Sequence, residues 1–131
     1  MKYNTWPGGS EVLGLVADND VAVLHASGAN VTQNRTIDSA ILSLNHSFYV
    51  QNYNTGGATA GSDNLIINGV ITQEYRGAVG TFSNGNLVTG YAKLYTYDAR
   101  LKYLSPPYFL SPTSSAWGRL SYSELTPNPA P

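Results

Sequence analysis

The sequence predicts an all-β protein: a short right-handed parallel β-helix, or β-solenoid, of about four coils, followed by an extended C-terminal tail rich in Pro and Tyr. Three observations support this prediction. Residues 64–97 begin with the apolar-polar alternation of a half-buried strand. Glycines then recur at short intervals and suit the corners of a repeatedly bent chain. A similar alternation lies upstream at 40–53, and the interval between the two copies, in the low twenties, is typical of one solenoid coil.

The first expected strands are short. The apolar run at 12–17 ends at Asp18-Asn19-Asp20, and a second strand follows at 21–24. We interpret the three polar residues as an Asx-type corner between the strands. The alternative is a calcium loop, although the further oxygen ligands and the closing Glu of an EF-hand are missing.

The two central segments are expected to supply the inward-facing row. In 40–53 the even positions are apolar (Ala40, Leu42, Leu44, Phe48 and Val50), and in 65–71 the odd positions are apolar or small (Leu65, Ile67, Gly69 and Ile71). Superposing the two copies places Leu44-Asn45 over Ile67-Asn68 and Phe48 over Ile71. Positive-φ corners are expected at the recurring glycines, namely Gly69, Gly77, Gly80, Gly85 and Gly90.

Two local signals predict turns in the C-terminal half. Asn84-Gly85 suits a type I′ hairpin turn. Asp98 is expected to be the N-cap of a short helical turn over 97–101.

The domain boundary is expected near residue 103. Residues 1–103 should form the solenoid, and 104–131 should form a tail that packs on the domain or leaves it. Pro106-Pro107 should keep the beginning of the tail extended. Trp117 is the expected anchor if the tail docks.

Composition excludes several classes of function. The chain has 131 residues, a formal net charge of −1 and no cysteine. It therefore has no basic patch for nucleic acid, no thiol chemistry and no zinc site of the usual Cys/His type. No segment is long and apolar enough to span a bilayer, and no signal peptide is recognisable. We expect no cofactor, no metal and no membrane contact by this fragment.

A row of aromatic residues is the first candidate binding surface. Tyr91, Lys93, Tyr95 and Tyr97 occupy one face of an alternating strand. Such a row can bind sugars or a partner, and it can equally form cross-strand pairs that stabilise the last coil.

Arg76 is the second candidate. It could fix a neighbouring coil through Glu74, Asp98 or loop carbonyls, or it could bind a ligand. The candidate ligand-binding residues are therefore Tyr91, Tyr95, Tyr97 and Arg76.

No catalytic residue is predicted. The only plausible cluster for polysaccharide chemistry is Asp18, Asp20, Asp38 and Arg35, and the spacing of these residues does not force them together. His25 and His46 are the only histidines, and neither accompanies a nucleophile-elbow motif. Core or corner roles are expected for both.

Five segments resemble the C-terminal region of bacterial surface proteins associated with type IV pili, the PilX-like or minor-pilin-like proteins. They are GLVADNDV at 14–21, the run from TIDSAILSLN to NY at 36–53, QEYRGAVGTF at 73–82, GYAKLYTYDARL at 90–101 and LSPPYFLSP at 104–112. The resemblance implies an exported β-solenoid domain of uncharacterised function. The pilin-type N-terminal helix of such proteins does not occur in this sequence, and the resemblance carries over no catalytic residue.

These expectations define a function. We expect a non-enzymatic extracellular structural or adhesive module of a type IV pilus-like cell-surface protein, as a fragment of a longer anchored chain. The expected partners are other pilus or cell-surface proteins and, in the alternative, surface glycans. The alternative function is that of a carbohydrate-binding or carbohydrate-active β-helix domain.

Overall fold

The computed structural model describes residues 1–30, 33–58, 63–107 and 109. Within these ranges the regular structure consists of β-strands and one 3-10 helix, so the prediction of an all-β fold is confirmed. None of the described helical structure is long and apolar enough to cross a membrane. The elements are β1 (Gly14–Ala17), β2 (Val21–Val23), β3 (Arg35–Ser43), β4 (Phe48–Val50), β5 (Asn64–Gln73), β6 (Gly80–Ser83), β7 (Asn86–Gly90), β8 (Ala92–Tyr97) and η1 (Ala99–Lys102).

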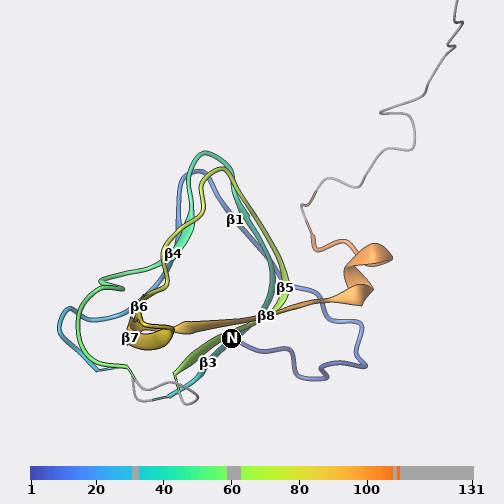
Figure 1. Ribbon diagram of the computed structural model, residues 1–131. Coiled ribbons are helices and arrows are strands. Elements are labelled where there is room, and N and C mark those ends of the chain that lie inside the picture. Colours follow the sequence, from blue (N-terminus) through green and yellow to red (C-terminus); the bar gives the residue numbers. More distant parts are fainter. Residues whose placement is uncertain (31–32, 59–62, 108, 110–131) are drawn as a thin grey trace, which may run out of the picture.

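Most strand pairs are parallel. The main sheet has the order β1-β3-β5-β8, and each neighbouring pair in it is parallel. The strands β2 and β4 form a second parallel pair. The backbone follows a roughly triangular path, and successive passes lie over one another at the corner beside β1 and β4 (Figure 1). Parallel pairing with no intervening helix requires the chain to make a full circuit between partners.

The predicted superposition of the two central segments is wrong. Ile71 pairs with Ile41 and not with Phe48, which instead pairs with Val21 of β2. Ala40 pairs with Gly14 on one side and with Val70 on the other, so the circuit from β3 to β5 is longer than the circuit from β1 to β3. The similarity between the two segments predicts a false register, because the connections between paired strands differ in length.

The core lies inside the triangle. Its buried members come from every side of the circuit: Val23, Ile41, Phe48, Val50, Leu65, Ile67, Val79 and Tyr91. The predicted inward row is confirmed for β5, where Leu65 and Ile67 are 0% and 1% exposed.

The predicted row in 40–53 is right only in its second half. Phe48 and Val50 are core residues, whereas on β3 the inward position is Ile41 and Leu44 is 53% exposed. The corner between β3 and β4 explains the difference, because it interrupts the alternation and shifts its phase.

The hairpin prediction is confirmed. The strands β6 and β7 are antiparallel, and the turn between them has Asn84 at φ 48° and Gly85 at φ 80°. Of the five predicted glycine corners, only Gly85 and Gly90 have positive φ. Gly69 instead lies inside β5, where an added Cβ would come within 1.9 Å of the Ser39 carbonyl oxygen. Its role is close backbone approach.

The helical turn is also confirmed. Asp98 is the N-cap of η1, and its carboxylate accepts a hydrogen bond from the Arg100 backbone N–H. The described start of the tail is not extended as predicted. The N–H of Phe109 donates to the carbonyl of Pro106 (3.2 Å), and both side chains reach Gly14 of β1. The predicted anchor, Trp117, lies outside the described residues.

Candidate functional site

The edge strand β8 places polar side chains at inward positions that are aliphatic on its neighbour β5. In the parallel pair of β5 and β8, Lys93 lies opposite Leu65 and Tyr95 lies opposite Ile67. Side chains at paired positions lie on the same side of a sheet. Lys93 and Tyr95 therefore lie on the same side of the sheet as the buried Leu65 and Ile67, but β8 is the edge of the sheet and no further described strand covers them.

These two side chains line a cleft of about 500 Å³. Phe48 and Ile71 provide the apolar part of the lining, the end of β5 supplies an amide group, and the corner that follows β5 supplies charged groups. The complete lining is Phe48, Ile71, Gln73, Glu74, Arg76, Gly77, Lys93 and Tyr95. The cleft thus combines apolar side chains, an aromatic ring, two cations, a carboxylate and an amide.

The two cations in the cleft have no anionic partner in the described part of the chain. The ion pairs found there join His46 with Asp20 and Arg100 with Asp98. Burial, together with the nearby charge of Arg76, lowers the pKa of Lys93. Arg76 and Lys93 therefore contribute positive charge to the same cleft without neutralising contacts.

Tyr95 is a neutral hydrogen-bonding group in this cleft. Burial raises the pKa of Tyr95 to about 12, although the charge of Arg76 acts in the opposite direction. The phenol therefore keeps its proton at neutral pH. Its ring remains accessible, since Tyr95 is 42% exposed.

The structure brings together two of the four predicted ligand-binding residues. Arg76 and Tyr95 line the same cleft. Tyr97 lies two residues further along β8 and is 53% exposed, but it does not line the cleft. Arg76 is exposed, and of its two suggested carboxylate partners Asp98 pairs with Arg100 instead.

Tyr91, the fourth predicted residue, belongs to the interior. It is 3% exposed, its hydroxyl accepts a hydrogen bond from Arg35 Nε (2.8 Å), and its ring meets the His25 ring edge-on. The prediction of a surface position is wrong, because Tyr91 packs into the core cluster that contains Leu65 and Ile67.

Lys93 was not predicted as a site residue, although its place in the alternating row of tyrosines indicated that it shares a face with Tyr95. Gln73 and Glu74 could not have been placed from the sequence, because their position in the cleft depends on the true register between β5 and β8.

The acidic corner at Asp18 and Asp20 is built from contacts to the next circuit. Asn45 Nδ2 donates to Asp18 Oδ1 (2.8 Å), and the Ser47 N–H donates to Asp20 Oδ1 (3.1 Å). His46 Nδ1 lies 2.5 Å from the same Asp20 oxygen and lowers the pKa of that carboxyl. In the described ranges, no group of three or more His, Asp or Glu side chains gathers as metal ligands.

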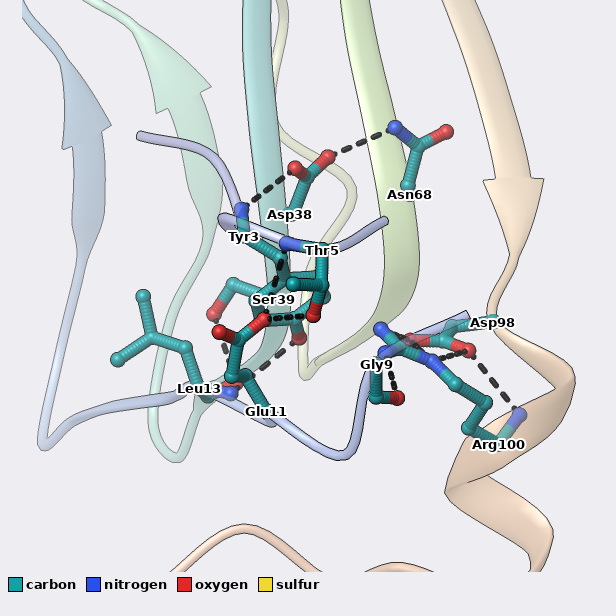
Figure 2. A network of polar contacts seen from close by, with 10 residues as sticks. All are labelled: Tyr3, Thr5, Gly9, Glu11, Leu13, Asp38, Ser39, Asn68, Asp98 and Arg100. Carbon is teal, nitrogen blue, oxygen red and sulfur yellow. Dashed lines mark hydrogen bonds and ion pairs between the residues drawn. The ribbon is translucent and has the colours of Figure 1, made fainter. Parts of the chain in front are cut away.

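The other members of the suspected acidic cluster have separate contacts. Asp38 is 2% exposed and accepts hydrogen bonds from the Tyr3 N–H (2.8 Å) and from Asn68 Nδ2 (2.7 Å), as Figure 2 shows. Arg35 is bonded to Tyr91. These contacts connect strands and the N-terminal segment, so the side chains act in the architecture.

Arg100 fixes the N-terminal segment to the end of β8. It forms a bidentate ion pair with Asp98 (2.8 Å for the shortest contact) and donates to the Gly9 carbonyl (2.6 Å), as Figure 2 shows. Its guanidinium also lies 4.8 Å from the ring centroid of Tyr3 and 4.9 Å from that of Trp6. This contact set links the two ends of the described fold.

The chain has no match among family models, curated proteins or solved structures. The resemblance to pilus-associated proteins therefore stays a prediction.

Proposed function

We propose that this chain is a short right-handed parallel β-helix of about four coils, which serves as a non-enzymatic structural or adhesive module of an exported, pilus-like surface protein. The observation that carries this proposal is the parallel register of β3 and β5, which is unbroken from Arg35 opposite Leu65 to Ser43 opposite Gln73. Parallel strands without crossover helices are typical of a solenoid.

Hydrogen bonds at the corners support the same architecture. Asp18 and Asn45 are 27 residues apart, as are Asn30 and Gly57. The Asn64 N–H and side-chain amide both contact Asn34 Oδ1, 30 residues away. These contacts join segments 27 or 30 residues apart, as expected if successive coils stabilise one another like neighbouring repeats.

The structural use of titratable groups favours a module without turnover. Asp38 joins the N-terminal segment to two strands, and Asp98 with Arg100 fixes the end of β8. His25 has both ring nitrogens near backbone carbonyl oxygens, those of Asn52 (3.3 Å) and Ala29 (3.0 Å). Groups that hydrolases commonly use for chemistry are here engaged in holding the chain.

Fractionation of the source cells tests this function. An antibody against the module should detect the native gene product in the envelope or in sheared surface filaments. A control antibody against a cytosolic enzyme should detect that enzyme only in the cytosolic fraction. Recovery of the native product exclusively with the cytosolic marker would contradict the proposed function.

A further inference from the structure

The cleft beside β8 contains features that coil stacking does not require. Arg76 enters it from the corner after β5, and Lys93 enters from the edge strand. Two like charges in one cleft disfavour the folded state, and the Glu74 carboxylate in the same lining forms no ion pair with either cation among the described residues. A second observation is that the hydrogen-bonding groups of Gln73, Glu74 and Tyr95 line the same cleft as the two cations.

We propose that this cleft binds a carboxylate-bearing saccharide, with the carboxylate between Arg76 and Lys93 and a sugar ring against Tyr95. The proposal goes beyond the structural role and does not depend on where the protein is displayed. Planar guanidinium groups bind carboxylates through paired N–H donors, and an ammonium group adds a point charge.

The remaining lining groups distinguish a sugar from a simple anion. Glu74 would repel a small anion, but its carboxylate can accept hydrogen bonds from hydroxyl groups. Gln73 Oε1 already accepts from the Phe48 N–H (2.8 Å), which leaves the Gln73 amide nitrogen as a donor. The neutral phenol of Tyr95 can donate as well. This mixture fits a ligand that carries one carboxylate among several hydroxyl groups.

The apolar and aromatic surfaces complete the fit. The accessible apolar surface comes from the half-buried Ile71 and the partly exposed ring of Tyr95, whereas Phe48 is 2% exposed and adds little area. The C–H face of a pyranose ring packs against such a surface while its hydroxyl groups remain hydrogen-bonded at the rim.

Edge protection is a competing role for Lys93. An inward-pointing charge on an edge strand prevents the addition of further strands. This role explains Lys93 alone and gives no reason for Arg76 to converge on the same cleft. The two roles predict different outcomes for substitutions.

The test is a calorimetric titration of the full chain with trigalacturonate, and with the same trisaccharide after its carboxyl groups have been reduced to alcohols. We expect saturable binding of the acidic form and at least about tenfold weaker binding of the reduced form, as expected for the loss of a charge-assisted contact. The variants Arg76→Gln and Lys93→Gln should each weaken binding of the acidic form by about tenfold. The matched control Lys102→Gln, which removes an exposed cation from η1, should leave affinity unchanged.

Four outcomes would overturn the proposal. They are absence of saturable binding, equal affinity for the reduced trisaccharide, an unchanged affinity in Arg76→Gln, and equally tight binding of a tri-aspartate peptide. Sedimentation of Lys93→Gln tests the competing role: self-association with unchanged sugar affinity would assign Lys93 to edge protection. Circular dichroism melting of each variant checks that the fold is retained.

Discussion

At β5 the inward positions Leu65 and Ile67 are aliphatic, whereas at the edge strand β8 the positions paired with them carry Lys93 and Tyr95. Ile37, Ile67 and Tyr95 occupy one row of paired positions. Ile67 is 1% exposed and Tyr95 is 42% exposed. The backbone register is continuous across this change. The place of a strand in the sheet therefore determines its role. The inner strand β5 buries apolar side chains, and the edge strand β8 presents polar groups to an open cleft.

The largest expected effect tests a buried position of the inner strand β5. Ile67→Ala should lower the free energy of unfolding by about 2–5 kcal/mol, because it removes buried methyl groups and leaves a cavity. Tyr95→Ala, the matched change at the edge, should cost less because its side chain is partly solvated. Urea unfolding followed by circular dichroism measures both values. Equal losses at the two positions would remove the distinction between inner strand and edge strand.

A second effect concerns the buried carboxylate that joins the N-terminal segment to the sheet. Asp38→Ala should lower the free energy of unfolding by about 1–3 kcal/mol, because two donors would lose their acceptor. Asp38→Asn keeps one acceptor oxygen and should cost less. The same urea titration applies, and a loss in Asp38→Ala no larger than that of an exposed control such as Glu74→Ala would contradict this role.

The loss of stability at acid pH tests the Arg100 clamp, by which we mean the ion pair of Arg100 with Asp98 and its hydrogen bond to the Gly9 carbonyl. Burial alone would raise the pKa of Asp98, but the hydrogen bonds and charge of Arg100 outweigh it, so the folded pKa lies below the ordinary value of 3.8. The ionised carboxylate therefore stabilises the folded state above pH 3.8, and this contribution is lost as pH falls through the lower folded pKa. Thermal melting between pH 2 and pH 6 should show a steeper acid loss in the native chain than in Asp98→Asn. Parallel curves would contradict the clamp.

The smallest expected effect is at the edge. The folded pKa of Lys93 lies below the ordinary value of 10.5, so its charge disfavours folding at neutral pH, and this cost disappears as pH rises through the folded and then the ordinary value. Lys93→Met should leave stability unchanged or raise it by well under about 1 kcal/mol, because solvent screens the exposed ammonium group of Lys93. Denaturant midpoints at pH 7 measure the difference. A clear destabilisation would mean that Lys93 supports the fold.

Some elements could be predicted because their signals are local. The alternation in 65–71, the Asn84-Gly85 turn and the Asp98 cap each depend on a few neighbouring residues. The residue spacing between paired strands was not predictable from two similar segments, because connections of unequal length allow several alignments.

The candidate site was predictable only in part. Arg76 and Tyr95 could be named from the sequence as separate candidates, but their meeting in one cleft depends on the register between β5 and the edge strand. The Arg100 clamp was missed because its contact with Gly9 joins residues 91 positions apart. Tyr91 was misplaced because its burial depends on packing against core residues that are distant in the sequence, such as Leu65 and Ile67.

The parallel register is the central claim, and disulfide trapping tests it most directly, since the native chain has no cysteine. Leu42 and Thr72 are paired across β3 and β5. Neighbouring Cα atoms in a sheet lie within disulfide range. The double variant Leu42→Cys/Thr72→Cys should cross-link rapidly under mild oxidation, whereas Asn45→Cys/Asn68→Cys, which the superposition of the two similar segments would bring together, should not. Cross-linking of the second pair in place of the first would contradict the account.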